Sequence, residues 1–475
     1  MIPIPIAAAI GFLEAKASGA QIGEVVAVIG DGALDNGLAL SSLNYLSSLK
    51  NKKMIIVIND NDMAITKNVG GMAKAFSKMR IKKSYKLIRK LTFKKIRNSV
   101  KALVYRNNIF TSLGLKYLGV VDGHDIKSLV DYFEYAKSLN ETVVIHVKTK
   151  KGKGYELSEN DSLGKWHSVD GFDSNTGELN KEDKYTWSEA VSDILYEKVK
   201  ENDKIRIILP AKSYGIGLEK IVSEYNDRVI DVGINEELAV EIASGMAKAG
   251  LIPIVMIYST FLQRAYDEIN NDINRTNNHV IFLVDRCGIV SNFGSTHQGI
   301  YDVSFMASLN NFTISMPRTL NEMKFLIDQA IISNNPFVIR YSKGEVNLTD
   351  SNYEYNKWNY VLEKKNINIL SYGNNVNEIL DEIKASNKDI GLINALFISR
   401  IDTEILKELD GSSLIIYEEV VKESSLGERI EQYIYENKLN INVSRFYVSG
   451  NIDEVDRLKI KERIGLSIKE IISNL

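Results

Sequence analysis

Two short polar turns combine the residue types that metal and diphosphate chemistry needs. Residues 30–32 (Gly-Asp-Gly) follow one apolar run, and residues 59–62 (Asn-Asp-Asn-Asp) follow another. Glycine lets the backbone approach a phosphate closely, while carboxylate and amide oxygens are ligands that Mg²⁺ prefers. The two turns therefore predict a site for Mg²⁺ and a diphosphate, provided that the fold brings them together.

The elements around the turns are expected to do so. Residues 25–29 and 54–58 are short apolar runs rich in β-branched residues, which is typical of parallel strands buried on both faces. Between them, the leucines of residues 38–49 recur at three- and four-residue steps and predict a crossover helix. Strand, helix and strand make a βαβ unit, in which ligands lie at the carboxyl ends of the strands.

Two other interpretations of the turns stay open. They can be unrelated loop turns, because both sequences contain common turn dipeptides. They can also belong to a calcium loop, but residues 60–64 lack the third ligand and the glycine of an EF-hand. The strand-helix-strand context favours the cofactor site.

The rest of the 475-residue chain continues the alternation of strands and helices, and its 44% hydrophobic content suffices for several cores. This pattern predicts an α/β protein with three successive parallel-sheet domains, at residues 1–175, 185–347 and 360–475. We expect a polar linker at residues 156–184, and we expect residues 233–237 to form a loop before a helix at 238–249. The third domain contains no set of residues with evident chemistry.

Composition excludes several classes of protein. The single cysteine, Cys287, excludes a disulfide framework and fits a reducing cytoplasm, which is the location we expect. No apolar run is long enough to span a membrane. The apolar start, residues 1–20, lacks the positive first region of a signal peptide and is predicted to be a core helix.

A basic segment interrupts the first domain. Between Met63 and Val121 the chain has 15 lysines and arginines and no acidic residue. An amphipathic helix here would suit nucleic acid or anionic lipid, but a solvated surface run is the commoner case. We therefore expect neither nucleic acid nor a membrane as a partner, and the sequence leaves the role of residues 67–116 open.

Nine stretches, in this order, resemble the 1-deoxy-D-xylulose-5-phosphate synthase family of transketolase-like enzymes: VIGDGAL, NDNDM, VDGHD, KTKKGKGYE, DVGINEELAV, IYSTFLQRAYDE, DRCGIV, THQGIYDVS and IRYSKG. The resemblance implies a homodimer with thiamine diphosphate and Mg²⁺. It also implies condensation of pyruvate with glyceraldehyde 3-phosphate, with release of CO₂, for isoprenoid, thiamine and pyridoxal synthesis.

The resemblance assigns roles to residues that match the family motifs. The implied metal ligands are Asp31, Asn61 and the backbone carbonyl of Met63. The implied cofactor-binding residues also include Gly30, Gly32, Ala33, Lys151, Glu236 and Phe261. Glu236 would be held protonated against the aminopyrimidine as a catalytic acid, and Phe261 would stack on that ring. The implied substrate-binding residues are Tyr258, Arg264, Arg286, Arg340 and the catalytic His297, while His167 matches less well.

Three departures from the family pattern bear on activity. Family members carry a histidine-bearing segment ahead of the first helix, Phe293 stands where they have an aspartate, and Glu237-Leu238 replaces Gln-His. Alternatives to a complete synthase therefore remain. The chain can be a split or truncated subunit that needs a separate N-terminal chain, a non-catalytic interaction protein, or another transketolase-type enzyme.

Overall fold

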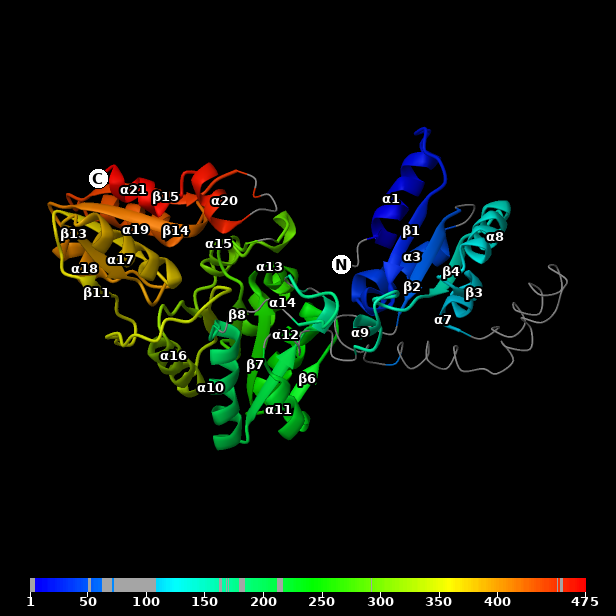
Figure 1. Ribbon diagram of the computed structural model, residues 1–475, viewed down its shortest axis with the longest axis horizontal. Coiled ribbons are helices and arrows are strands. Elements are labelled where there is room, and N and C mark those ends of the chain that lie inside the picture. Colours follow the sequence, from blue (N-terminus) through cyan, green and yellow to red (C-terminus); the bar gives the residue numbers. More distant parts are fainter. Residues whose placement is uncertain are drawn as a thin grey trace. The chain divides into compact units, whose positions relative to one another are not determined.

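The computed structural model describes residues 5–49, 53–61, 71, 108–161, 165–167, 169, 171–178, 184–211, 217–291, 293–450, 452 and 456–475. Most of the basic segment, including Met63, lies outside these residues. The chain divides into two compact units, coloured blue to cyan and mainly green to red in Figure 1. Unit 1 holds residues 1–180, 211–214 and 231–235, and unit 2 holds the remainder.

Unit 1 is built on a parallel sheet of order β1-β2-β4-β3. Its strands are β1 (Val26–Gly30), β2 (Ile55–Asp60), β3 (Lys116–Asp122) and β4 (Val143–Lys148). Its helices are α1 (Pro5–Ala17), α2 (Asp31–Leu34), α3 (Gly37–Ser48), α7 (Ile109–Ser112), α8 (Ile126–Ser138) and α9 (Glu156–Glu159). The apolar runs in β2 and β4 are buried on both faces, as expected of central parallel strands. The same expectation was wrong for residues 25–29, because β1 is an edge strand that exposes Val26 and Val28 on one face.

Unit 2 begins with a sheet of order β6-β5-β7-β8-β10-β9. Its strands are β5 (Ile205–Leu209), β6 (Val229–Asp231), β7 (Ile252–Tyr258), β8 (Ile281–Asp285), β9 (Thr313–Ser315) and β10 (Phe337–Arg340). The longer helices are α10 (Trp187–Glu201), α12 (Glu236–Lys248) and α16 (Leu320–Ile332), and the shorter ones are α11 (Glu219–Glu224), α13 (Ser259–Leu262), α14 (Tyr266–Glu268) and α15 (Asp302–Met306). Thr186 and Glu189 form a capping box that starts α10, so the chain begins this domain with a well-defined helix.

The second sheet of unit 2 has the order β11-β13-β12-β14-β15. Its strands are β11 (Asn359–Leu362), β12 (Ile367–Ser371), β13 (Ile390–Asn394), β14 (Ser413–Val421) and β15 (Asn442–Val448). Its helices are α17 (Asn374–Ser386), α18 (Thr403–Glu408), α19 (Leu426–Glu436), α20 (Arg457–Arg463) and α21 (Ile468–Ser473). Only the edge strand β11 is antiparallel among the pairings described here, so a parallel sheet again forms the domain.

The predicted fold class, three parallel-sheet α/β domains, is confirmed. The predicted domain boundaries stay predictions. Several local assignments need correction. Strand β2 continues through Asp60, so two residues of the expected polar turn belong to the strand. Helix α12 begins at Glu236 instead of after it, and the expected linker contains helix α9.

The expected linker also packs more tightly than its composition suggests. The rings of Tyr155, Trp166 and Phe172 contact one another, with centroids 4.8 to 5.8 Å apart. Aromatic contacts of this kind stabilise a short segment that has little other core. Within the described residues, no helix has the length and apolar character needed to cross a membrane.

Candidate functional site

The first predicted metal ligand, Asp31, begins helix α2 at the carboxyl end of β1. Its side chain is buried, and its Oδ1 accepts a hydrogen bond from the Gly32 backbone N–H at 3.1 Å. Gly30 is the last residue of β1, and Gly32 and Ala33 follow Asp31 inside α2. The predicted glycine-acid turn is therefore a strand-to-helix junction, with the carboxylate near the first free N–H groups of a helix.

The second predicted metal ligand, Asn61, follows β2 directly and is half-buried. Strands β1 and β2 are parallel neighbours in which Gly30 pairs with Asn59. Asp31 and Asn61 thus leave adjacent strands at the same edge of the sheet, as the sequence pattern requires. The third predicted ligand, Met63, lies outside the described residues.

The loop after β4 brings a lysine to this edge. Burial lowers the pKa of Lys151, and the charges of Asp161 and Asp31 oppose that shift, so this cation lies within electrostatic reach of Asp31. The Nζ atom of Lys151 is 2.9 Å from Nδ1 of His167. The Thr149 hydroxyl donates to the Asn59 side chain at 2.7 Å and ties the loop to the end of β2.

A buried polar chain beneath this edge was missed by sequence reasoning. Asp60 Oδ2 is 2.6 Å from Nε2 of His146, and Nδ1 of His146 is 2.6 Å from the hydroxyl of Tyr117. All three side chains are buried, and they come from β2, β4 and β3. The chain links β2, β4 and β3, and its carboxylate belongs to the residue that precedes Asn61. A histidine inside the apolar run of β4 was the available signal, because a buried histidine needs polar partners.

In unit 2, the predicted catalytic carboxylate Glu236 is 3% exposed in the first turn of α12. Arg264 donates from Nη1 to Glu236 Oε2 at 2.5 Å and from Nη2 to Glu237 Oε1 at 3.4 Å. The other oxygen of Glu237, Oε2, is buried without a hydrogen-bond partner in the described part of the chain. The carboxylate that the resemblance assigns to the aminopyrimidine is thus ion-paired with Arg264 in this structure, and its assignment to the cofactor stays a prediction.

Six side chains at the end of β7 or in the segments after β7, β8 and β10 form an aromatic–cation cluster: Tyr258, Phe261, Arg286, Phe293, His297 and Lys343. The ring of Phe261 is 6.0 Å from Tyr258 and 5.6 Å from His297, measured between centroids. The ring of Phe293 is 5.8 Å from His297. Four residues that the sequence selected for substrate or cofactor thus lie together, and Phe293 joins them.

Two cations lie over the rings of this cluster. The Arg286 guanidinium is 4.0 Å from the centroid of Tyr258 and 4.9 Å from that of Phe293. The Lys343 ammonium is 4.7 Å from the Phe293 centroid. Burial raises the pKa of Tyr258 to about 12 although Arg286 opposes the shift, so the phenol stays protonated and can donate a hydrogen bond at neutral pH.

Arg340 does not join the cluster. Its side chain is buried, and it donates from Nε and Nη2 to both oxygens of Asp302, at 2.6 and 3.0 Å. Nη1 lies 3.3 Å from the sulfur of Met316. In this structure the guanidinium is a core ion pair, and its assignment to substrate stays a prediction.

Comparisons with known proteins bear on the whole chain. A family model described as 1-deoxy-D-xylulose-5-phosphate synthase matches residues 4–149. The transketolase pyrimidine-binding domain matches residues 183–349, and the transketolase C-terminal domain matches residues 356–471. The 1-deoxy-D-xylulose-5-phosphate synthase of Clostridium tetani is 35% identical over 484 aligned residues, which cover 95% of this chain and 78% of the relative.

The chain belongs to the 1-deoxy-D-xylulose-5-phosphate synthase family. A second family member, from Thermus thermophilus, is 35% identical over 95% of this chain and 77% of its own length. A third, from Clostridium perfringens, is 38% identical over 91% of this chain and 74% of its own length. The predicted family is therefore confirmed.

Solved structures support the same fold. Transketolase from Campylobacter jejuni matches with a TM-score of 0.53 at 16% identity, over 100% of this synthase-family chain and 81% of its own. A structure titled "Split gene transketolase, inactive beta4 tetramer" matches with a TM-score of 0.54 at 21% identity, over 60% of this chain and 95% of its own. At these identities the matches show the transketolase-like fold alone.

Proposed function

We propose that this chain is a 1-deoxy-D-xylulose-5-phosphate synthase, which joins pyruvate to glyceraldehyde 3-phosphate with loss of CO₂. Its product would supply isoprenoid, thiamine and pyridoxal synthesis. The observation that carries the proposal is the 35% identity to the Clostridium tetani synthase over 95% of this chain. The aromatic–cation cluster supports it, because both substrates are anions.

The residues present fit thiamine diphosphate and Mg²⁺. Asp31 and Asn61 contribute a carboxylate and an amide oxygen at one sheet edge, which is the donor chemistry of a Mg²⁺ site, and Met63 would add its backbone carbonyl. Lys151 would place positive charge beside the diphosphate. When bound, thiamine diphosphate would supply an acidic carbon that can add to a carbonyl and a cationic ring that can accept the electron pair left behind when CO₂ departs.

Glu236 and Phe261 would serve the aminopyrimidine. Glu236 would hold a proton at the ring nitrogen that it faces, and Phe261 would fix the plane of the ring by stacking. The ion pair with Arg264 stabilises Glu236 as a carboxylate. Holding that proton therefore requires Arg264 to turn toward Glu237, which already accepts from its Nη2.

The remaining cluster residues would orient the substrates. Arg286 presents a planar guanidinium that can hold a carboxylate or phosphate by two parallel hydrogen bonds. Tyr258 donates as a neutral phenol, and His297 can transfer a proton near neutral pH. We also propose a homodimer in the cytoplasm, which sedimentation and cell fractionation would test.

Calorimetry of the purified chain tests the cofactor site. Thiamine diphosphate should bind only with Mg²⁺, and Asp31→Ala should abolish that binding because it removes the charged ligand. Glu134→Ala, an exposed acid on α8 of the same unit, is the matched control and should bind normally. Unchanged binding by Asp31→Ala would refute the proposed metal site.

A second assay tests the chemistry. Mass spectrometry should detect 1-deoxy-D-xylulose 5-phosphate after incubation with both substrates, cofactor and Mg²⁺. Glu236→Ala should retain cofactor binding but lose hydrogen exchange at C2 of the thiazolium. Wild-type exchange in that variant would contradict the role of Glu236.

Two departures favour a second candidate, a transketolase-type enzyme with another acceptor. Phe293 presents a ring to Arg286 and Lys343, and Glu237 adds a carboxylate beside Arg264. A panel of phosphorylated and unphosphorylated aldehydes would distinguish the two. A preference for glyceraldehyde 3-phosphate supports the synthase, whereas a preference for another aldehyde supports the second candidate.

A further inference from the structure

The loop after strand β8 carries two members of the aromatic–cation cluster, Phe293 and His297. At its base, Gly288 and Gly299 exchange two backbone hydrogen bonds, of 2.7 and 2.9 Å. This pairing closes the loop into a compact excursion of residues 288–291 and 293–299. The position of His297 therefore depends on how the base of the loop is held.

The interior of the loop is held by one buried side chain. Gln298 accepts from the Val290 N–H at 2.8 Å and donates to the carbonyls of Val290 and Phe293, at 3.2 and 2.9 Å. These bonds keep the two arms of the loop together. They do not tie the loop to the rest of the protein. On the His297 side, the Thr260 hydroxyl of α13 donates to the Thr296 carbonyl at 2.8 Å, and the side of residues 288–291 is held by other contacts.

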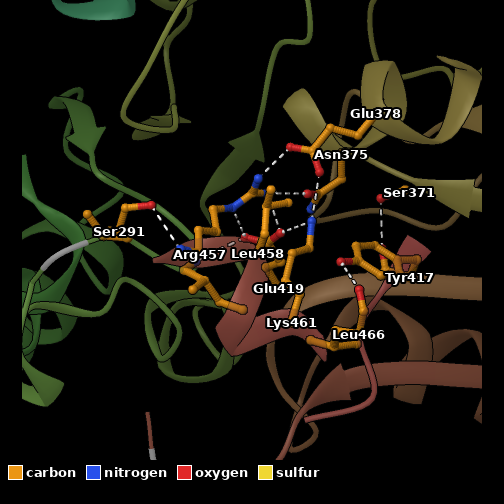
Figure 2. A network of polar contacts seen from close by, with 12 residues as sticks. Ser291, Ser371, Asn375, Glu378, Tyr417, Glu419, Arg457, Leu458, Lys461 and Leu466 are labelled. Atoms are coloured by element: carbon orange, nitrogen blue, oxygen red, sulfur yellow. Dashed lines mark hydrogen bonds and ion pairs between the residues drawn. The ribbon is translucent and has the colours of Figure 1, made fainter. Parts of the chain in front are cut away.

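A C-terminal charge network lies next to this loop and consists of Glu378, Glu419, Arg457 and Lys461 (Figure 2). Arg457 and Lys461 each contact both carboxylates. Arg457 bonds to Glu378 at 2.6 Å and to both oxygens of Glu419, while Lys461 lies 2.7 Å from Glu378 and 2.9 Å from Glu419. Figure 2 also shows Asn375 accepting from Arg457, at 3.1 Å.

Glu419 extends the network to the loop. Its Oε2 accepts from the Ile289 backbone N–H at 3.0 Å, although Glu419 lies 130 residues further along the chain. Gly288 passes so close that a Cβ there would lie 2.8 Å from Glu419 Oε2, and the residue has a positive φ of 85°. The loop backbone is therefore fitted to this carboxylate, and only glycine is suited to position 288.

Arg457 provides a second anchor. Its backbone N–H donates to the hydroxyl of Ser291 at 3.0 Å, as Figure 2 shows. Loop residues on both sides of Val290 are thus tied to the C-terminal domain. The network thus offers the loop one donor, the Arg457 N–H, and one acceptor, the Glu419 carboxylate. Hydrogen bonds of both kinds fix an irregular backbone.

We propose that Glu419, held in place by Arg457 and Lys461, is a positioning residue that sets the loop of residues 288–299 and so aims His297 at the substrate. The proposal rests on the proposed function of His297. It gives the C-terminal domain a part in the reaction through its contacts with this loop. Stability alone does not explain the arrangement, since buried ion pairs are often no more stable than apolar packing.

The decisive variant is Glu419→Gln. In the part of the chain that the structure describes, the groups that bond to the two Glu419 oxygens are donors, namely the Ile289 N–H, Arg457 and Lys461. A glutamine must point its own NH₂ at one of these donors, so the anchor is weakened while the side-chain shape is kept. Glu418→Gln is the matched control. Glu418 is the preceding residue of β14 and is also buried among donors, but it bonds to Tyr372, Leu426 and Gly427 instead of the loop.

Hydrogen exchange by mass spectrometry measures the loop directly in the full chain. In Glu419→Gln, the amides of peptide 288–299 should exchange about tenfold faster than in the wild type, since the Ile289 N–H loses its charged acceptor and the anchor is weakened. Glu418→Gln should leave this peptide unchanged. Equal exchange in wild type and Glu419→Gln would overturn the proposal.

A double-mutant cycle then tests the link to His297. Glu419→Gln should lower kcat/KM about tenfold in the wild type but less than twofold in a His297→Ala background, because coupled residues are not additive. The affinity for thiamine diphosphate should stay within twofold. The proposal is refuted if Glu419→Gln lowers kcat/KM by the same factor in both backgrounds. It is also refuted if Glu419→Gln and the Glu418→Gln control lose cofactor affinity alike, because both results would show a merely structural role.

Failure of the proposed function gives a different result. If the wild type makes no product, the synthase assignment fails, and the exchange measurement alone decides whether Glu419 holds the loop. If Glu419→Gln does not fold, Ser291→Ala replaces it, with the exposed Ser295→Ala as control. Ser291→Ala should speed exchange of the same peptide two- to threefold, and no change would overturn the proposal.

Discussion

Arg286 and Arg457 both lie beside the loop of residues 288–299, yet their neighbours differ in kind. Arg286 lies over the rings of Tyr258 and Phe293, and within the described residues its guanidinium makes no hydrogen bond or ion pair. Arg457 is bonded to the carboxylates of Glu378 and Glu419. A ring face attracts a cation without using its N–H donors, whereas a carboxylate occupies them.

The difference suggests how to tell a ligand-binding arginine from a structural one. A guanidinium over rings retains donors for an incoming anion, and its desolvation is already partly compensated. A guanidinium among carboxylates is neutralised and serves the fold. By this criterion Arg340, which is paired with Asp302, resembles Arg457 more than Arg286.

The largest expected effect is a loss of stability when Arg457, the structural arginine of the comparison, is replaced. Arg457→Met should lower the free energy of unfolding by about 3–5 kcal/mol, because it leaves two carboxylates near a single lysine. Chemical denaturation measures this change. Lys365→Met, which removes an exposed ion pair with Asp389 at 2.8 Å, should cost much less, because solvent screens that pair. Equal losses in the two variants would contradict the assignment.

Low pH should weaken the charge network of Glu378, Glu419, Arg457 and Lys461. Burial would raise the pKa of Glu419, but Arg457, Lys461 and the Ile289 N–H lower it to about 2, from an ordinary value of 4.5. A lowered pKa stabilises the folded state above pH 4.5, and that contribution is lost as the pH falls toward 2. Denaturation at several pH values should show Glu419→Gln less stable than wild type by roughly 3 kcal/mol at pH 7. A gap that does not shrink below pH 4.5 would contradict this prediction.

Replacing Arg286, the proposed ligand-binding arginine, should change the enzyme kinetics and leave the stability nearly unchanged. Arg286→Met should lower kcat/KM for the phosphorylated aldehyde about a hundredfold, while unfolding changes by less than about 1 kcal/mol. Arg286→Lys should recover only part of the loss, because a lysine cannot offer two parallel hydrogen bonds. Steady-state assays check both variants. Normal kinetics in Arg286→Met would remove Arg286 from the substrate site.

The smallest expected effect tests whether the Phe293 ring orients Arg286 and Lys343. Phe293→Leu removes the cation–π contacts with Arg286 and Lys343 but keeps an apolar side chain, so KM for the aldehyde should rise about two- to fivefold. Phe293→Tyr keeps a ring and should restore the wild-type KM. A wild-type KM in Phe293→Leu would show that the ring does not orient the cations.

Much of the fold could be predicted from continuous apolar runs. The strand predicted at residues 25–29 lies within one residue of β1 (Val26–Gly30) at each end. The end of β2 was set too early, since Asn59 and Asp60 are polar. Asp60 is tolerated inside the strand because His146 satisfies its carboxylate. Tertiary partners, which a sequence pattern does not contain, decided that boundary.

The candidate site was predicted unevenly for the same reason. Tyr258, Phe261, Arg286 and His297 were selected by motif, and the structure brings them together. The C-terminal charge network was missed, because Glu378, Glu419 and Arg457 are far apart in the chain. One signal existed: two adjacent acids, Glu418 and Glu419, sit inside the apolar strand β14, and buried carboxylates require partners.

The glycines at the base of the loop constrain how this protein can be re-engineered. A Cβ at Gly299 would lie 2.1 Å from the Arg286 carbonyl oxygen, and one at Gly288 would meet Glu419. A side chain at position 299 would force the two arms of the loop apart, and one at position 288 would displace the Glu419 carboxylate. A mutant library that aims to change the accepted aldehyde should therefore randomise positions 293 and 343 and keep both glycines fixed, so that every variant inherits the same loop backbone.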